Sequence, residues 1–199
     1  MRRKPQARSS RMDGQYTTPD HRILVNRGSR VVDRLAVVDV EASGLSPLSY
    51  PIEVGIYGNR VQYQKLILPV KSWDHWSAKA EALHGLSRDH LLRNGEHVRD
   101  VARELNSLLG ATCVYSDHAD WDGFWIQRLF AAASIRQHFS VADIRDLFTT
   151  GELADYTTAF EGLNRDVRRR AHRALDDART IHEAMACVLD RPVEEYKES

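Results

Sequence analysis

Two acidic residues inside an apolar segment constrain this chain more than any other feature. Residues 35–41 read Leu-Ala-Val-Val-Asp-Val-Glu, a composition typical of a buried β-strand. Successive strand residues alternate between the two faces of a sheet, so Asp39 and Glu41 point the same way. Neighbouring anions at the end of a buried strand resist desolvation unless a cation neutralises them, and an oxygen-preferring divalent metal suits that role. The alternative is that the strand ends at Val38 and both acids lie in solvent.

Composition favours one domain of ordinary size. The chain has 199 residues, of which 42% are hydrophobic, and its net charge is zero. No apolar run approaches the roughly 20 residues needed to cross a bilayer. The two cysteines form no Cys-x-x-Cys pair, which fits a reducing compartment. We therefore expect a cytoplasmic protein without a membrane anchor, although the basic first residues leave a transit-peptide interpretation open.

The charge pattern divides the chain into an arm, a domain and a tail. Residues 1–33 hold eight Lys or Arg against three Asp or Glu and lack apolar periodicity, so we expect a basic, flexible N-terminal arm. Such an arm suits a nucleic-acid backbone, but a solvated tail is the commoner explanation. Residues 34–190 form the expected domain, and residues 191–199 form a C-terminal tail.

Regular elements are expected from residue 34 onwards. Three strands of a meander are predicted at 35–41, 52–57 and 61–68, and two further strands at 112–116 and 139–144. Helices are predicted at 76–83, 87–92, 97–109, 121–133, 152–161 and 173–189. Strands followed by alternating helices imply an α/β fold, a mixed five-stranded sheet with helices on both faces.

Three carboxylates surround the start of the helix predicted at 121–133. They are Asp117, Asp120 and Asp122. Acids in a first helical turn interact favourably with the helix dipole, and we expect that structural role for Asp117 and Asp120.

His172 and Asp177 lie at the start of the last predicted helix. Five residues on one helix would place their side chains about 140° apart. We therefore expect His172 on the preceding loop, from which it can face the same centre as Asp177. His84 and Asp89 have the same spacing, so the surrounding residues must decide what the pair does.

Five segments give the decisive pattern. In chain order they are Val38-Asp39-Val40-Glu41-Ala42-Ser43-Gly44-Leu45, Ile52-Glu53-Val54-Gly55-Ile56, Leu83-His84-Gly85-Leu86-Ser87, Trp121-Asp122-Gly123-Phe124-Trp125-Ile126 and His172-Arg173-Ala174-Leu175-Asp176-Asp177-Ala178. In this order they resemble motifs of the DEDDh branch of the DnaQ-like 3′-to-5′ exonucleases, which have an RNase H-like fold. Two positions depart from the family pattern: Ser43 replaces the usual Thr, and Asp117-His118 replaces the usual His-Asn.

The resemblance implies hydrolysis of single-stranded nucleic acid from its 3′ end to nucleoside 5′-monophosphates, with two Mg²⁺ or Mn²⁺ ions. It implies that Asp39 bridges the ions, that Glu41 and Asp177 hold the ion that binds the attacking water, and that Asp122 supports the second ion. His172 would be the general base, a role that suits an imidazole, whose unperturbed pKa is near 6.5. The implied substrate contacts are Ser43, Gly44, Leu45 and His84.

Residues outside the motifs allow weaker predictions. We expect Trp73 and Trp76 to pack against the meander, and His84 to cap or pack its own turn. The residues expected in the core of the helix at 121–133 are Trp121, Phe124, Trp125 and Leu129. We expect a cluster of five arginines near His172 to contact substrate phosphates, although a solvated loop is the alternative. They are Arg165, Arg168, Arg169, Arg170 and Arg173.

Several alternatives stay open at this point. DNA is slightly favoured over RNA as the substrate, while an exoribonuclease or an oligoribonuclease-type RNA turnover enzyme is the first alternative. A nucleic-acid-binding module without catalytic activity is the second, and the complete carboxylate set argues against it. A homodimer and a polymerase or repair partner are both compatible with the sequence.

Overall fold

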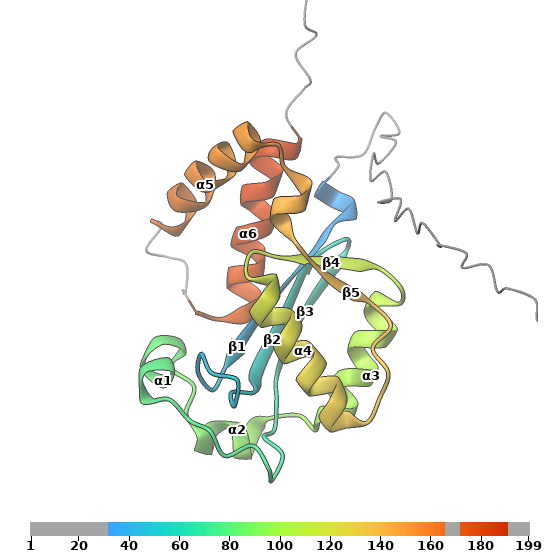
Figure 1. The fold of residues 1–199 in the computed structure, drawn as a ribbon, viewed down its shortest axis with the longest axis vertical. Coiled ribbons are helices and arrows are strands. Elements are labelled where there is room, and N and C mark those ends of the chain that lie inside the picture. Colours follow the sequence, from blue (N-terminus) through green and yellow to red (C-terminus); the bar gives the residue numbers. More distant parts are fainter. Residues whose placement is uncertain (1–31, 166–171, 191–199) are drawn as a thin grey trace, which may run out of the picture.

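A five-stranded sheet flanked by helices forms the body of the protein (Figure 1). The computed structural model describes residues 32–165 and 172–190. The strands are β1 Ala36–Ala42, β2 Pro51–Gly58, β3 Val61–Leu66, β4 Cys113–Ser116 and β5 Ser140–Asp143. The helices are α1 Ala78–His84, α2 Arg88–Asn94, α3 Val98–Leu109, α4 Ala119–Ala133, α5 Thr150–Asn164 and α6 Ala174–Leu189, with 3-10 turns η1 Val32–Arg34 and η2 Ile144–Leu147.

The strand order is β3-β2-β1-β4-β5. The first three strands form an antiparallel meander, while β4 runs parallel to β1 and β5 runs parallel to β4. Between β2 and β3 the chain reverses through Asn59 and Arg60, whose φ angles are both positive, as in a two-residue hairpin turn. The predicted α/β fold, a mixed sheet of five strands, is confirmed.

Each face of the sheet has its own hydrophobic core. Ala36, Val38 and Val40 of β1 pack with α3 and α4 in one core. Val37 packs with α5 and α6 in the other, and Figure 1 shows α5 lying beside α6. Asp39 and Glu41 share the face of Val37 because strand residues alternate. Both acids therefore lie on the α6 face, at the end of β1.

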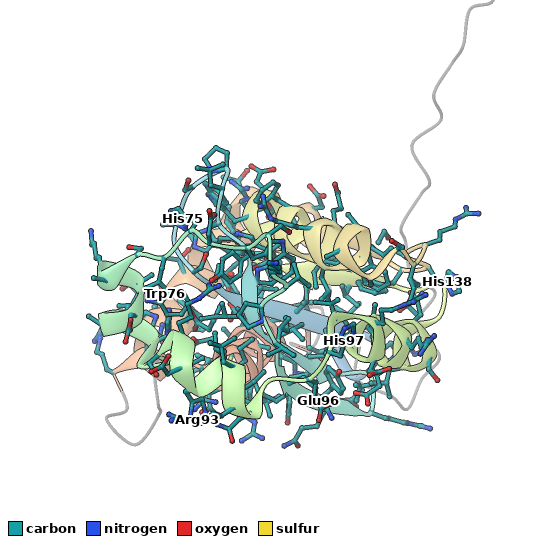
Figure 2. All side chains as sticks on the ribbon, turned by 90° about the horizontal axis from the view of Figure 1, so that it is seen from below. His75, Trp76, Arg93, Glu96, His97 and His138 are labelled. Carbon is teal, nitrogen blue, oxygen red and sulfur yellow. The ribbon has the colours of Figure 1, made fainter. Side chains whose placement is uncertain are left out.

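The segment between β3 and α3 is held by stacking and by helix caps. Tyr50 stacks on the buried Trp73 at 5.0 Å between ring centroids. Ser77 and Ser87 cap α1 and α2 by accepting backbone N–H groups. Figure 2 views this end of the molecule, with His75 and Trp76 on the segment that leads into α1. The predicted packing role is confirmed for the buried Trp73 and for Trp76, which is half-buried against the same core and donates a hydrogen bond to Glu81.

A few details differ from the predicted pattern. Strand β3 ends at Leu66; Ile67 still donates its N–H to the Ile52 carbonyl and also forms a bridge with Glu96. Val32 was assigned to the arm but is fully buried against α6. Residues 1–31 of the predicted arm, Arg168 to Arg170 and the predicted tail lie outside the described residues. None of the described helices is both long and apolar enough to cross a membrane.

Candidate metal centre

A pocket of about 630 Å³ opens at the end of β1 that carries the acidic residues. Its walls come from segments far apart in the sequence, namely β1 and the loop after it, the first helix α1, the start of α4 and the start of α6. Of the residues predicted to form a site, the lining includes Asp39, Glu41, Gly44, Leu45, His84, Asp122, His172 and Asp177.

Side chains at this pocket and beside it form two groups that could hold a metal ion, each with ligand atoms within 4.8 Å of one another. One group contains Glu41, His172 and Asp177. The other contains Asp39, Asp117 and Asp122. Carboxylate oxygens are the donors that Mg²⁺ and Mn²⁺ prefer, and an imidazole nitrogen also suits transition metals. The residues present therefore fit two divalent ions held by adjacent ligand sets.

Burial and mutual repulsion disfavour the ionised forms of the acids in the two groups. Burial, followed by repulsion from Asp122 and Glu41, raises the pKa of Asp39 well above its usual value. Burial also raises the pKa of Glu41 and that of Asp122 to about 8 each, and that of Asp177 to about 6. Bringing these acids together therefore costs free energy that a bound cation recovers.

Because of these raised pKa values, the metal-free protein should become less stable as the pH rises. A carboxyl group whose pKa is raised on folding stabilises the protein most below its unfolded pKa near 4, and this contribution is lost as the pH rises through the folded value. The relevant folded values are about 6 for Asp177 and about 8 for Glu41 and Asp122. In EDTA, we expect the Tm to fall between pH 5 and pH 8.

Adding Mn²⁺ at pH 8 is expected to restore the Tm, because the ion binds the ionised acids. Thermal unfolding across this pH range, with EDTA or Mn²⁺, measures both effects. A Tm in EDTA that rises steadily from pH 5 to pH 8 would contradict the assignment of these pKa values.

Asp122, rather than Asp120, is the acid of α4 that joins the cluster. Asp122 is only 2% exposed and accepts a hydrogen bond from the Ser116 hydroxyl at 2.5 Å. Asp120 lies in the same helical turn but is exposed to solvent. The geometry therefore places Asp122 beside Asp39 and gives Asp120 the helix-dipole position expected for it.

Asp117 is the acid whose position differs from the prediction. It lies before the helix, in the turn after β4, and its carboxylate joins those of Asp39 and Asp122. Burial raises its pKa. Its place follows from topology, since β1 and β4 are adjacent parallel strands whose carboxyl ends meet at one edge. The replacement of the family's His-Asn by Asp117-His118 was the sequence signal for this extra carboxylate.

Substitution of Asp117 tests whether this extra carboxylate contributes to metal binding. We expect Asp117→Asn to weaken Mn²⁺ binding by about 10- to 100-fold, the range known for partners of metal ligands. The exposed neighbour supplies a matched control, so Asp120→Asn should leave the affinity unchanged. Titration calorimetry with Mn²⁺ measures both variants, and equal affinities in the two would show that Asp117 does not contact the ions.

His172 lies immediately before α6, as expected. Its φ is +62°, a left-handed conformation that is uncommon for a residue other than glycine and is enriched at functional sites. The His172 ring and the backbone amides of His172 and Arg173 all lower the pKa of Asp177, against the larger effect of burial. The loop and the first turns of α6 thus hold the histidine and the carboxylate against Glu41 of β1.

Three of the four predicted substrate contacts line the pocket, and Ser43 does not. Gly44 and Leu45 line the pocket, and Leu45 is 74% exposed there. His84 is buried and also lines the pocket; its Nδ1 accepts the Leu86 N–H, which confirms the expected capping of its turn. Burial lowers the pKa of His84, and the Ala42 backbone opposes that shift. No group among the described residues lies at hydrogen-bonding geometry to the His84 Nε2.

Ser43 does not line the pocket, and its polar groups have partners inside the turn after β1. Its hydroxyl accepts the Tyr50 N–H at 3.1 Å and lies 3.3 Å from Nδ1 of His75. Its backbone N–H donates to Tyr50, and its carbonyl accepts from Ser77. With these partners satisfied internally and the side chain 1% exposed, Ser43 holds the turn that presents Gly44 and Leu45.

Two further predictions require correction. Trp125 and Leu129 lie in the core as expected, but Trp121 and Phe124 are only partly buried, and Trp121 lines the pocket. Arg173 does not lie free in a solvated loop, because its Nε and Nη2 donate hydrogen bonds to the buried Glu53. Arg165 pairs with Glu161 at 3.8 Å on the exposed surface of α5.

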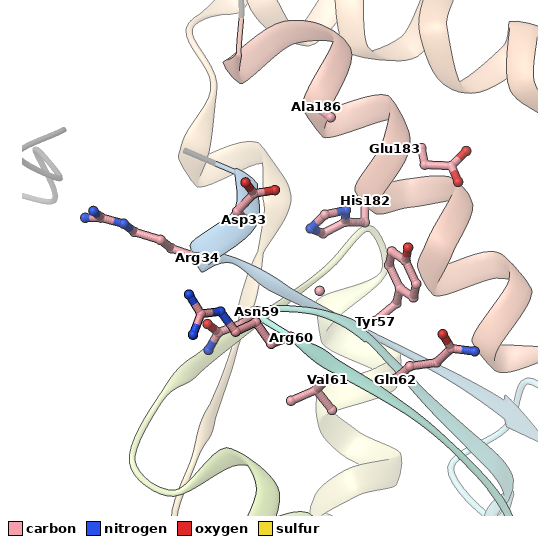
Figure 3. Close-up of a pocket in the computed structure, with 11 residues that line it drawn as sticks. Asp33, Arg34, Tyr57, Asn59, Arg60, Val61, Gln62, His182, Glu183 and Ala186 are labelled. Atoms are coloured by element: carbon pink, nitrogen blue, oxygen red, sulfur yellow. The ribbon is translucent and has the colours of Figure 1, made fainter. Parts of the chain in front are cut away.

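A second pocket of about 940 Å³ lies at the β2–β3 hairpin and the later part of α6 (Figure 3). Its charged lining is mixed, with Asp33 and Glu183 alongside Arg34 and Arg60. His182 lies 3.1 Å from the Val32 carbonyl and packs edge-on against Tyr57, as expected of a structural histidine. The candidate centre is therefore the smaller, acidic pocket.

Comparison with solved structures shows which fold this is. Exonuclease I from Methylocaldum szegediense matches 80% of this chain with a TM-score of 0.60 at 15% identity. The zinc-bound complex of E. coli Exonuclease I with single-stranded DNA matches 77% with a TM-score of 0.54 at 16% identity. A full-length 3′-exonuclease matches 79% with a TM-score of 0.57 at 16% identity. This chain has the exonuclease fold.

The exonuclease fold found here corresponds to only part of those proteins. The matched region is 41% of the Methylocaldum chain, 39% of the E. coli chain and 62% of the third. No protein-family model and no curated protein matches the chain. The likeness therefore establishes the fold, and the chemistry rests on the residues of this chain.

Proposed function

We propose that the protein is a metal-dependent 3′-to-5′ exonuclease that acts on single-stranded nucleic acid. The observation that carries the proposal is the pair of ligand groups, Glu41-His172-Asp177 and Asp39-Asp117-Asp122, of which all members except Asp117 line one pocket of an exonuclease fold. Purely structural acids would have no reason to gather in a buried cluster where each raises the pKa of another.

The ligand groups assign a position to each carboxylate. Glu41 and Asp177 would hold one ion, and Asp117 and Asp122 would hold the other. Asp39 would be shared between them, because its carboxylate interacts with acids of both groups. When bound, two such ions stabilise the attacking and the leaving oxygen of an in-line displacement and lower the pKa of the attacking water.

His172 is the general base in this proposal. Its side chain lies in the ligand group of Glu41 and Asp177, so it faces the water that attacks the terminal phosphodiester. The imidazole takes a proton of that water as the water oxygen bonds to phosphorus and the P–O3′ bond breaks, and the leaving O3′ takes a proton from solvent. The phosphate stays on the released nucleotide, which leaves as a nucleoside 5′-monophosphate, and the shortened strand keeps a free 3′ hydroxyl.

The rest of the pocket provides a surface for the 3′-terminal nucleotide. Leu45 and Leu83 are exposed apolar side chains on its rim, 74% and 58% exposed, and suit contact with a base or sugar. The buried Nε2 of His84 is a polar group without a partner in the described chain, which a bound oxygen would satisfy. Lys79 adds a positive charge on α1 for a backbone phosphate.

Single-stranded DNA is our preferred substrate, and RNA is the alternative. The preference rests on the similar structures, which were solved with DNA oligonucleotides. Mg²⁺ and Mn²⁺ are the proposed ions. A cytoplasmic location, a basic arm at residues 1–33, a catalytic domain at 34–190 and a tail at 191–199 remain predictions, as does any homodimer or any polymerase or repair partner.

End-labelled oligonucleotides test the proposal. The purified protein is incubated with 3′-labelled or 5′-labelled single strands of DNA and RNA of equal sequence, in Mg²⁺, Mn²⁺ or EDTA. The proposal predicts immediate loss of a 3′ label, a ladder from the 5′-labelled strand and no reaction in EDTA. Retained binding without cleavage under any condition would instead identify a nucleic-acid-binding module without catalytic activity.

A further inference from the structure

Beneath the candidate centre lies an ion pair that the catalytic scheme does not use. Glu53 of β2 is fully buried, and its carboxylate accepts hydrogen bonds from Arg173 Nε at 3.0 Å and Nη2 at 2.6 Å. It also accepts the backbone N–H of Ala174 at 3.1 Å. Ala174 is the first residue of α6, and Arg173 offers no side-chain cap of its own. A carboxylate from the sheet therefore caps α6.

A glycine of β2 also contacts the start of α6 closely. Gly55, two residues along β2 from Glu53, faces the backbone of Ala174 so closely that a Cβ there would lie 2.2 Å from the Ala174 carbonyl carbon. Only glycine permits this approach. An ion pair and a glycine thus fix the start of α6 against β2 at the residues that directly follow His172.

The position of this contact relates it to the metal ligands. Glu53 lies directly opposite Glu41 in the β1–β2 pairing, so two glutamates are neighbours on one face of the sheet. Like charges in that arrangement repel. Arg173 acts electrostatically on Glu41 as well as on Glu53, and its charge is held by the bidentate contact with Glu53.

We propose that Glu53, with Arg173 and Gly55, is a positioning device that holds His172 and Asp177 of α6 at the distance from Glu41 that metal binding requires. This inference rests on the proposed function. Without Glu53, the Arg173 guanidinium is released beside Glu41 and competes with the ion for that carboxylate. Without the close contact at Gly55, α6 moves away from β2 and carries the ligand Asp177 and the general base His172 away from Glu41.

The test separates positioning from stability. Removing one partner of a buried ion pair leaves an unpaired charge and destabilises the fold, whereas replacing both partners with apolar residues is often close to neutral. The informative variant is therefore Glu53→Met with Arg173→Met. Asp100→Asn with Arg103→Gln, which removes an exposed ion pair on α3, is the matched control.

Three quantities are measured for each variant: the Tm in EDTA, the affinity for Mn²⁺ without nucleic acid, and kcat and KM on a single-stranded DNA. For the buried double variant, we expect a Tm close to that of the wild type, Mn²⁺ affinity at least tenfold weaker and kcat lowered by about 100-fold with little change in KM, the scale of a 1 Å misplacement. Gly55→Ala should give the same loss of kcat.

A folded double variant with wild-type kcat and Mn²⁺ affinity would overturn the proposal. If the double variant does not fold, Gly55→Ala decides by the same readouts. Failure of the proposed function is recognised separately, because the wild type would then show no cleavage; the Mn²⁺ affinities of the variants would still support or overturn the positioning role.

Discussion

Replacing Asp39 with Asn is expected to abolish both metal binding and cleavage while leaving the protein folded. Asp39 is the carboxylate that interacts with acids of both ligand groups, so its loss removes a ligand from each ion. Metal ions supply several kcal/mol of transition-state stabilisation, and every 1.36 kcal/mol corresponds to a factor of ten. We therefore expect kcat to fall by about 10³-fold or more.

The same substitution should stabilise the metal-free protein. Repulsion from Asp122, Glu41 and Asp177 contributes to the raised pKa of Asp39, and a neutral amide removes that repulsion. In EDTA at pH 8, the Tm of Asp39→Asn should exceed that of the wild type, and added Mn²⁺ should no longer raise it. Asp120→Asn is the control. An Asp39→Asn protein that keeps wild-type Mn²⁺ affinity would show that this acid is structural.

The second large effect is expected at His172. Asparagine removes the imidazole but, like histidine, tolerates the left-handed backbone conformation found there. General-base catalysis contributes about 10²- to 10⁴-fold, so His172→Asn should lower kcat by that factor. The thermal unfolding and the binding of a single strand should change little, because the side chain contributes to the reaction rather than to the core.

His118 provides the matched control for this variant. It also lines the pocket but belongs to neither ligand group, and its side chain is exposed. Single-turnover rates of His172→Asn and His118→Asn are compared in Mn²⁺. If both variants cleave at the wild-type rate, a residue other than His172 activates the water.

The fold and the acidic centre could be predicted from local patterns. Two carboxylates on one face of an apolar strand predict a bound cation. The order of the five motif segments predicts that Asp122, His172 and Asp177 lie near them. The structure brings Asp39, Glu41, Asp122, His172 and Asp177 to one pocket. The spacing of residues along strands and helices determines which side chains share a face, so it could predict which side chains lie together.

Residues whose position depends on tertiary pairing could not be placed in this way. Asp117 was interpreted as a helix-dipole acid, because the parallel pairing of β1 with β4 is not visible in a local window. Arg173 was assigned to substrate phosphates, because its partner Glu53 lies 120 residues earlier in the chain. The motif alone does not reveal that Tyr50 and Ser77 hold Ser43 inside a turn, and its predicted contact with substrate stays a prediction.

The most direct measurement identifies the products released from an unlabelled single-stranded DNA in Mg²⁺, Mn²⁺ or EDTA by liquid chromatography with mass detection. The account predicts nucleoside 5′-monophosphates, formed from the 3′ end in the presence of either metal and lost in EDTA, in Asp39→Asn and in Asp177→Ala. Products with 3′-phosphates, or equal release in EDTA and in both variants, would contradict a metal-dependent exonuclease centred on these carboxylates.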